Sequence, residues 1–366
     1  MFSTRSRRWL PAIAASTALA IAGCGGDDES SGGSGGASTG EGGQTTEVVY
    51  SLPTPESLEF YAPIVAEQLG FFQEEGVEPK LASASEEIPS TAFLENGDAD
   101  IAMADIDELI ISTAKGGTLQ AVFSPQHANT QGTVVPEDSE IQEFTDLKGK
   151  KVGLASEEDS ASVEAQLKAA GLSKDDIEPI VVGTSGPLIK STFDKGDIDA
   201  YVGAVSDFTA MRAAGLELRN ITPPDVQKID GNPTAVTPEN LESKRDALVG
   251  FLRAWSMGQH VGQVNMEATE AMVRDKVPAE WRNEEVARAA LEQTIELHKP
   301  DDPERIGDLR PEVWETGQDL LASVGIIDEK VDVSKILDDS LIEEINDFDR
   351  AEVERKAEEW LAENGS

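Results

Sequence analysis

The sequence predicts an α/β protein made of two lobes of related build. Three observations support this prediction. Strand-like and helix-like stretches alternate along the chain, one sequence pattern recurs about a hundred residues later, and about 320 residues follow the N-terminal segment. Such alternation is typical of βαβ units with a mainly parallel sheet. A body of that length is long enough for two lobes with separate cores.

Residues 1–23 are predicted to be a cleavable export signal. Three arginines precede an apolar run over 12–22, which is too short to span a bilayer. The run ends at Ile21-Ala22-Gly23-Cys24, which resembles the bacterial lipobox, in which the cysteine thiol accepts a diacylglyceryl group. Cys24 is the one cysteine of the chain, so it forms no internal disulfide, and we expect it to be lipidated. An incidental buried cysteine is the alternative, and the export route is left open.

Residues 24–46 are predicted to form the lipidated cysteine and a flexible tether. The segment is rich in Gly, Ser and acidic residues and has almost no apolar side chains, so it cannot bury enough surface to order itself. Lipid and tether together predict a body held at the extracytoplasmic face of the cell membrane. The chain carries 70 acidic and 30 basic residues, and this net charge of −40 disfavours nucleic acid as a partner.

The first lobe is predicted from a strand broken by Pro53 and Pro55, a helix closed by Gly70, and further strands and helices in turn. Its expected strands are 48–52, 77–81, 100–104 and 119–123, and its expected helices cover 58–69, 86–95 and the stretch after 109. The second set has expected strands at 151–154, 177–182 and 200–205 and helices at 160–170 and 188–193. After Pro233 the pattern changes to consecutive helices over 241–255, 284–298, 312–323 and a last one ending at Leu361.

One sequence pattern occurs twice. The run Phe93-Leu94-Glu95-Asn96-Gly97-Asp98-Ala99-Asp100 is paralleled by Phe193-Asp194-Lys195-Gly196-Asp197-Ile198-Asp199. Each copy predicts a helix end, a glycine in the left-handed conformation and an acidic turn into a strand. Chance is the alternative for so common a turn. Its place in two similar series of elements favours two related lobes.

Four motifs occur in order along the body: Gly70-Phe71-Phe72 with Glu75-Gly76-Val77, Gly97-Asp98-Ala99-Asp100-Ile101-Ala102, Asp146-Leu147-Lys148-Gly149-Lys150-Lys151-Val152-Gly153, and Gly196-Asp197-Ile198-Asp199-Ala200. They resemble motifs of NMT1/THI5-like substrate-binding proteins, relatives of the sulfonate-, taurine-, nitrate- and thiamine-pyrimidine-binding subunits of ABC importers. The resemblance covers residues 47–255 in order. It implies a type II periplasmic-binding-protein fold, in which two α/β lobes are joined by two hinge crossovers and enclose a ligand.

The same resemblance implies lobe I from 47–125 with 230–366, which include extra C-terminal helices, and lobe II from 126–229. The crossovers are expected near 123–132 and 218–233. Ligand sites of such folds lie at the carboxyl ends of strands. Those positions select Glu56, Tyr61, Asp105, Gln126, His127, Ser156, Ser160 and Asp207 as candidate ligand-binding residues.

Each candidate has a structural alternative. Tyr61 is either a stacking surface or core, Glu56 a first-turn acid favoured by the helix dipole, and Asp105 part of a solvated face. His127 with Gln126 suits a heterocycle but equally a hydrogen-bonded hinge. Ser156 and Ser160 flank a helix start that attracts anions, yet the acids at 157–159 oppose one. Asp207 occupies the matching place in the second lobe.

The five loops at these strand ends, 51–61, 104–107, 124–129, 155–160 and 203–208, contain no Lys or Arg. We therefore expect a neutral or amine-bearing ligand, such as a thiamine pyrimidine precursor, rather than a sulfonate, taurine or nitrate. The expected role is ligand delivery to an ABC permease and ATPase by a monomer. We expect no catalytic residue, metal or cofactor, and therefore no enzyme, because no known catalytic motif occurs. A ligand sensor and a pyrimidine-synthesising enzyme are the alternatives of another class.

Overall fold

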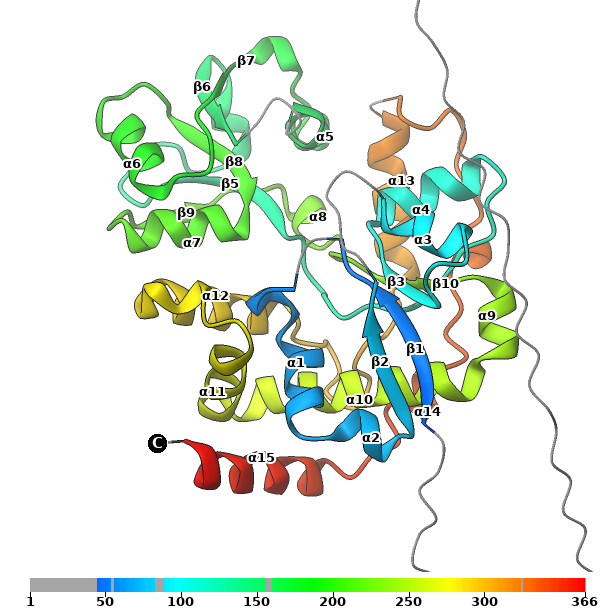
Figure 1. Cartoon of the computed structure of the whole chain (residues 1–366). Coiled ribbons are helices and arrows are strands. Elements are labelled where there is room, and N and C mark those ends of the chain that lie inside the picture. The colour runs from blue at the N-terminus through cyan, green and yellow to red at the C-terminus, as the bar shows by residue number, and fades with distance from the viewer. Residues whose placement is uncertain (1–44, 54–55, 83–88, 156–159, 324, 366) are drawn as a thin grey trace, which may run out of the picture. The chain divides into compact units, whose positions relative to one another are not determined.

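Two five-stranded mixed sheets form the framework of the computed structural model (Figure 1). The structure describes residues 45–53, 56–82, 89–155, 160–323 and 325–365, without the side chains of 160–162. The predicted export signal, Cys24 and the tether through residue 44 lie outside the described residues and stay predictions. Among the described helices, none combines the length and the apolar character needed to cross a bilayer.

The first sheet has the order β2-β1-β3-β10-β4, and the second has the order β7-β6-β8-β5-β9. The strands of the first sheet are β1 (Thr46–Ser51), β2 (Val77–Leu81), β3 (Ile101–Met103), β4 (Gln120–Phe123) and β10 (Thr234–Val236). Those of the second are β5 (Gln131–Pro136), β6 (Lys150–Leu154), β7 (Ile177–Val181), β8 (Ala200–Ala204) and β9 (Leu218–Asn220). In each sheet the fourth strand, β10 or β5, runs antiparallel to both of its neighbours.

The two sheets have the same topology because each receives its antiparallel strand directly after the chain crosses over. Residues 124–130 lead from β4 to β5, and residues 221–233 lead from β9 to β10. The fold is therefore the predicted α/β arrangement with two connecting segments. The finer lobe boundaries at 125/126 and 229/230 stay a prediction.

The repeated sequence pattern occupies equivalent places in the two sheets. Gly97 (φ 76°) and Gly196 (φ 70°) are both left-handed, and each leads into the third strand of its sheet. The equivalence extends to the edge strands, where Pro79 of β2 is paired with Val48 and Pro179 of β7 with Val152. The two halves thus share strand order, turn and register.

Helices pack on both faces of the sheets. The α-helices are α1 (Tyr61–Gln68), α2 (Phe71–Glu74), α3 (Ser90–Glu95), α4 (Ile106–Ala114), α5 (Ser160–Ala169), α6 (Gly186–Asp194), α7 (Val205–Ala213), α8 (Pro224–Gln227), α9 (Pro238–Ser243), α10 (Arg245–Val264), α11 (Met266–Lys276), α12 (Glu284–Leu297), α13 (Pro311–Ser323), α14 (Ile342–Ile345) and α15 (Arg350–Asn364). Short 3₁₀ helices are η1 (Leu58–Phe60), η2 (Phe144–Leu147), η3 (Lys174–Asp176), η4 (Glu280–Arg282) and η5 (Val333–Lys335).

Helix α10 is the central packing element of the first sheet's lobe. Its residues Phe251 and Trp255 form aromatic contacts with each other at 5.8 Å and belong to the same core as α1 and α11. The sequence predicted one helix over 241–255; the structure instead ends α9 at Ser243 and extends α10 to Val264. Lys244 breaks the helix and donates to Asp100 at 2.6 Å, a partner far away in sequence.

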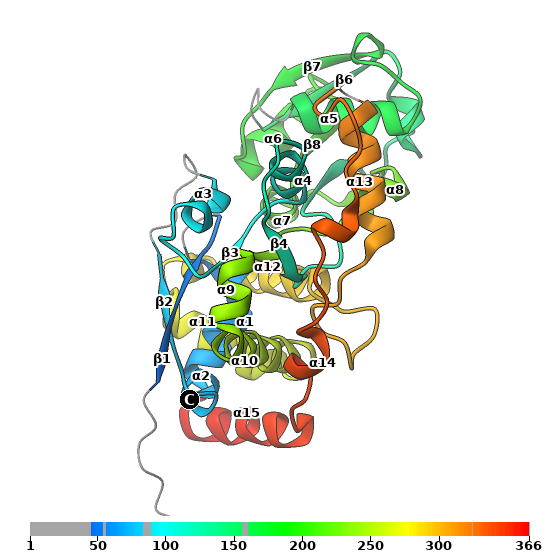
Figure 2. The same cartoon turned by 90° about the vertical axis from the view of Figure 1, so that its right-hand side faces the viewer.

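The C-terminal helices reach both lobes. Helix α12 packs against α7 of the second sheet's lobe, and α13 packs between α4 and α5 (Figures 1 and 2). Thr209 of α7 donates to Gln293 of α12 at 2.8 Å, and Lys168 of α5 donates to the carbonyl of Ser323 at the end of α13. The segment beyond α11 is therefore part of the contacts between the two lobes.

Candidate functional site

The candidate site lies where the strands of the first sheet end and the crossovers begin. Asp105 follows β3, Gln126 follows β4, and Asn232 precedes β10. Because β10 is antiparallel to β3 and β4, its first residues lie at the same edge as their carboxyl ends. The two crossovers and the start of α4 therefore meet at one place, which carries the polar side chains that the sequence selected.

A chain of hydrogen bonds joins these side chains. Asn232 Nδ2 donates to Asp105 Oδ1, while the Asn232 backbone N–H donates to Gln126 Oε1 at 2.9 Å. The Gln126 side chain also hydrogen-bonds the carboxylate of Glu59, which lies in η1. Gln126 is almost fully buried, so its amide is a fixed support for groups on either side. The structure thus connects Asp105 and Gln126 through Asn232.

Four carboxylates gather around this chain: Glu59, Asp105, Asp107 and Glu108, which we call the acidic cluster. Burial and the neighbouring carboxylates raise the pKa of Asp105 to about 6 and that of Glu108 to about 7. Burial also raises the pKa of Glu59 and Asp107. Asp105 and Asp107 nevertheless reach solvent, and Glu59 and Glu108 are half-buried. The carboxylates of the cluster can therefore be reached by a ligand, while their surroundings disfavour the charged form.

No basic side chain of the described residues forms an ion pair with the acidic cluster. The ion pairs of this part of the chain lie elsewhere, and the groups that shift the pKa of Asp105 and Glu108 are other carboxylates and hydrogen bonds. The internal segments outside the description, 54–55, 83–88, 156–159 and 324, contain no Lys or Arg either. Within the described residues no three carboxylate, His or Cys side chains are placed as metal ligands. A bound organic cation would therefore relieve an uncompensated charge.

His127 lies in the first crossover and is held by the C-terminal segment. Its backbone N–H donates to the Leu297 carbonyl at 3.0 Å, and its Nδ1 accepts from the Asp301 backbone N–H at 3.4 Å. Burial and the nearby Arg310 lower the pKa of His127, which keeps its ring neutral at neutral pH. A hydrogen bond between the ring and the Asp308 backbone opposes that shift.

Two candidates of the first loop have other surroundings. Tyr61 is fully buried and packs edge-on against His298 at 5.2 Å, in the core between α1 and α10. Tyr61 is therefore a core residue in this structure, because a ligand cannot reach a fully buried ring. Glu56 is half-buried and lies 4.0 Å from Lys276, and burial raises its pKa. Its carboxylate is partly compensated, unlike those of the acidic cluster.

The candidates in the second lobe are less informative. Asp207 is buried in the first turn of α7, where its carboxylate accepts from the Ala204 backbone N–H at 3.0 Å and from the Tyr201 hydroxyl at 3.1 Å. These two bonds cap the start of α7 and hold the Tyr201 hydroxyl, which is a structural role for Asp207. Ser156 lies outside the described residues. Ser160 is the first residue of α5, and its side chain is not described. Their ligand contacts stay predictions.

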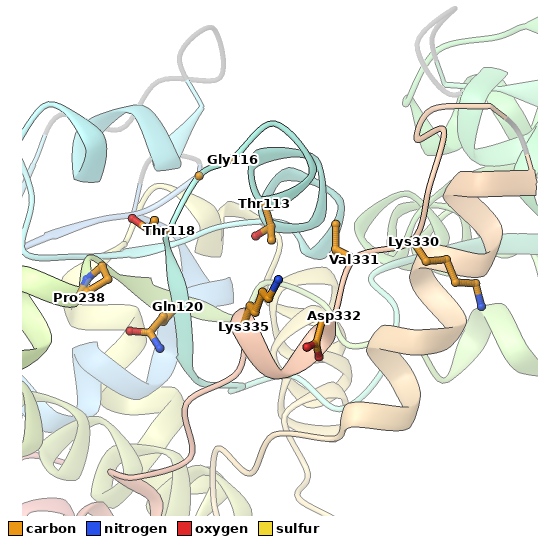
Figure 3. A pocket seen from close by; sticks show the side chains of 10 residues that line it. Thr113, Gly116, Thr118, Gln120, Pro238, Lys330, Val331, Asp332 and Lys335 are labelled. Carbon is orange, nitrogen blue, oxygen red and sulfur yellow. The ribbon is translucent and has the colours of Figure 1, made fainter.

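A hollow of about 780 Å³ lies at the opposite edge of the first sheet (Figure 3). It is lined by the end of α4, by Gln120 at the start of β4, and by residues 330–335. Figure 3 shows that Lys330 extends away from the other labelled side chains, and Lys330 pairs with Asp319. None of the predicted ligand-binding residues lines this hollow, which therefore has no part in the candidate site.

Sequence reasoning missed Glu59, Asp107, Glu108 and Asn232 as members of the site. Asp107 and Glu108 follow Asp105 directly and form the first turn of α4, where acids are common because of the helix dipole. Glu59 and Asn232 become site residues only through partners that are 67 and 127 positions away. The signal available in the sequence was their position at predicted strand ends, which the acidic composition of the whole chain obscured.

The sequence model of the family described as NMT1/THI5 like matches residues 57–261, which is more than half of the chain. The chain belongs to the NMT1/THI5-like family. The match spans η1 through most of α10 and so includes the acidic cluster, both crossovers and the entire second sheet. The helices from α11 onward, which reach both lobes, lie outside it.

Curated relatives of this NMT1/THI5-like chain match about half of their own length. A protein of Aspergillus parasiticus named 4-amino-5-hydroxymethyl-2-methylpyrimidine phosphate synthase is 25% identical over 185 residues, 50% of this chain and 53% of the relative. A putative thiamine biosynthesis protein of Haemophilus influenzae is 31% identical over 150 residues, 40% of this chain and 46% of the relative.

Solved structures share the fold at low sequence identity. The periplasmic aliphatic sulphonate binding protein SsuA of Escherichia coli is 17% identical with a TM-score of 0.60, over 79% of this chain and 91% of that protein. The NMT1/THI5-like chain therefore has the periplasmic-binding-protein fold that the sequence predicted.

One sequence-based expectation is contradicted. The absence of catalytic motifs predicted that the chain is not an enzyme, yet several curated relatives carry the name of a synthase, which is an enzyme. The inference was unsound because this fold holds its functional groups at strand ends, without a local motif that a sequence scan detects.

Proposed function

We propose that the chain is an extracytoplasmic solute-binding lipoprotein of an ABC importer that captures an amine-bearing heterocycle, such as a thiamine pyrimidine precursor. Membership of the NMT1/THI5-like family and the shared fold of periplasmic binding proteins support the binding role. In this proposal the ligand lies at the acidic cluster, and Asp105 and Gln126 contact it. Glu56, His127, Ser156, Ser160 and Asp207 remain candidate contacts.

The acidic cluster is the observation that favours this ligand class. A protonated amine, or the donor edge of an aminopyrimidine, supplies N–H groups to acceptors that have no cationic partner among the described residues. A sulfonate or nitrate would instead add negative charge beside Asp105, Asp107 and Glu108, where burial already raises each pKa and neighbouring carboxylates raise those of Asp105 and Glu108 further. Binding of such an anion at this place is therefore disfavoured.

The membrane attachment in this proposal comes from the sequence. Cys24 carries the lipid, residues 24–46 are the tether, and the permease and ATPase of the importer are the partners. Metabolic labelling with a radioactive fatty acid tests the anchor: the parent chain incorporates label and Cys24→Ser does not. Label retained by Cys24→Ser would refute lipidation at this residue.

A second candidate function is synthesis of a pyrimidine, and the names of the curated relatives favour it. Both functions involve the same class of heterocycle, as the cargo of a binding protein or as the product of a synthase. Mass spectrometry of a cell extract incubated with the full chain separates them. An amount of the aminopyrimidine above that of an extract without the chain supports synthesis, and an unchanged total, part of it bound to the chain, supports capture and delivery.

Thermal unfolding of the full chain against a panel of ligands tests the proposed ligand class. The panel contains aminopyrimidines, simple amines, methanesulfonate, taurine and nitrate. A ligand that binds only the folded state adds about 2.7 kcal/mol at a hundredfold excess over its Kd, which gives a clear rise in Tm. We expect that rise with aminopyrimidines. A rise with methanesulfonate or nitrate and none with aminopyrimidines would refute the proposed ligand class.

A further inference from the structure

Arg310 contacts both crossover segments at once. It lies just before α13, outside the region that the family model matches. Its Nη2 donates to the His127 carbonyl in the first crossover at 3.0 Å and to the Lys228 carbonyl in the second at 3.3 Å. The same nitrogen pairs with the carboxylate of Asp230, also in the second crossover. One guanidinium thus links two segments that are about a hundred residues apart.

The surroundings of this ion pair make it a fixed joint. The Asp230 side chain is 0% exposed and that of Arg310 is 14% exposed. The second oxygen of Asp230 accepts from the Ser124 hydroxyl of the first crossover at 3.0 Å. Nη2 carries two N–H groups and shares them among the two carbonyls and the Asp230 carboxylate, while Nη1 of the same planar fork pairs with Asp301 at 3.2 Å. A buried carboxylate that loses such a partner is strongly disfavoured.

Backbone contacts attach the same joint to the first sheet's lobe. Ser124 N–H donates to the Gly307 carbonyl at 2.9 Å, which ties the first crossover to the segment before α13. Ile306 and Leu309 of that segment belong to the two cores that flank the first sheet. The beginning of the first crossover and the end of the second are therefore part of this lobe.

The opposite ends of the crossovers belong to the other lobe. The Thr133 N–H in β5 donates to the Thr222 hydroxyl at 2.8 Å. This bond attaches the end of β9 and the start of the second crossover to the second sheet's lobe. Between these two anchored parts lie residues 128–129 and 223–227, because the Thr130 carbonyl accepts from the Val205 N–H, Gln131 pairs with Ala204 in the second sheet, and Arg310 holds the Lys228 carbonyl. A relative rotation of the lobes has to be absorbed there, since hinge motion changes the backbone angles of only a few residues.

We propose that Arg310 is a positioning residue that fixes both crossovers to the first sheet's lobe and so confines lobe rotation to residues 128–129 and 223–227. The effect on ligand affinity rests on the proposed function, whereas the effect on lobe movement does not. Without the guanidinium, the crossovers loosen and the lobes sample a wider range of separations. Ligand affinity then falls because the competent arrangement is less populated.

Spin-label distance measurements on the full chain test this proposal. Labels are placed at Glu78→Cys in β2 and Glu178→Cys in β7, two exposed positions in equivalent places of the two sheets, in a Cys24→Ser background. We expect a narrow distance distribution for this parent and a broadened one for Arg310→Gln. Arg305→Gln is the matched control, because Arg305 pairs with Asp308 in the same segment and contacts neither crossover.

Two further variants keep the test decisive. Arg310→Lys retains the charge but not the fork, so we expect an intermediate width. Ser124→Ala removes one link to Asp230 while keeping the ion pair, and it serves if Arg310→Gln does not fold; we expect a smaller broadening. Parent-like distributions in every folded variant would overturn the proposal, as would equal broadening in Arg305→Gln.

Ligand binding provides the second readout. With an aminopyrimidine that binds the parent, we expect Arg310→Gln to weaken binding by about tenfold, which corresponds to a competent fraction reduced to about one tenth. Unchanged affinity together with a broadened distribution would overturn the link to binding. A chain that binds no member of the panel would refute the proposed function, while the distance measurement still decides the role of Arg310.

Discussion

Asn232 Nδ2 donates a hydrogen bond to Asp105 Oδ1, so a residue of the second crossover fixes the carboxylate that follows β3. The two residues are 127 positions apart, and the bond exists only because β10 returns to the first sheet beside β3. Asn232 also reaches Gln126 in the first crossover. The candidate site and the ends of both crossovers that belong to the first sheet's lobe are therefore one connected unit.

Asp105→Asn tests the role of the acidic cluster. The substitution keeps the size of the side chain and removes its charge, so we expect the affinity for an amine-bearing ligand to fall by about tenfold, or ~1.4 kcal/mol. Calorimetric titration measures this change. Asp98→Asn, an exposed acid in the turn before β3, is the matched control and should bind like the parent. Equal loss in both variants would indicate a general effect of net charge.

Ligand affinity should depend on pH in the window set by Asp105 and Glu108. Their pKa values are about 6 and about 7, so both carboxylates lose their charge as the pH falls through that range. A simple amine stays protonated there, so its affinity is full above about pH 8 and falls between about pH 8 and 5. Titrations at several pH values check this, and a flat profile would contradict it.

The unliganded chain should show the opposite trend in the same pH window. A carboxyl whose pKa is raised by folding binds its proton more tightly in the folded state than in the unfolded one. Deprotonation therefore costs stability, and the contribution of Asp105 and Glu108 to the free energy of unfolding decreases as the pH rises from about 4 to 7. Asp105→Asn should remove part of that decrease. Urea unfolding across this range measures it, and identical slopes in parent and variant would argue against the raised pKa of Asp105.

The repeated acidic turns predict a pair of stability effects. Asp100 accepts from the Val49 N–H at 3.0 Å, and Asp199 accepts from the Lys151 N–H at 2.9 Å. We expect Asp199→Ala to reduce the free energy of unfolding by about 1–3 kcal/mol. Asp100→Ala should cost more, because Asp100 is more buried and also pairs with Lys244. Urea unfolding of both variants checks the order, and a larger loss in Asp199→Ala would contradict it.

Gly262 of α10 provides a test of the Tyr61 environment. A Cβ at this position would lie 2.2 Å from Cε2 of the Tyr61 ring, so Gly262→Ala should destabilise the chain by about 1–3 kcal/mol. Gly317→Ala in α13 is the matched control, since its Cβ would have ordinary contacts and the helix gains about 1 kcal/mol in propensity. If Gly262→Ala were as stable as the parent, Tyr61 would be less tightly packed than the structure shows.

The sequence predicted the alternation of strands and helices because many strands, such as β1 and β4, contain short apolar stretches bounded by turn residues. β2 was predicted at 77–81 as observed, and α12 and α13 to within one residue. The repeated turn was also predicted from local sequence, because a glycine at a helix end indicates a left-handed backbone conformation. The break at Lys244 was missed, and the partner of this residue, Asp100, is 144 positions away.

The site was predicted only where position alone identifies a residue. Asp105 and Gln126 follow strands directly, so the fold places them at the site. Glu59 is one acid among many until its contact with Gln126 is known. Arg310 belongs to no motif, and its importance comes from carbonyls on two crossovers that meet only in the folded chain.

Calorimetric titration of the full chain with an aminopyrimidine, compared with methanesulfonate at the same pH 7.5, tests the central claim most directly. The account predicts binding of the aminopyrimidine by the parent, weaker binding by Asp105→Asn, and no heat from methanesulfonate. Tight binding of methanesulfonate that Asp105→Asn leaves unchanged or strengthens, with no response to the aminopyrimidine, would contradict it.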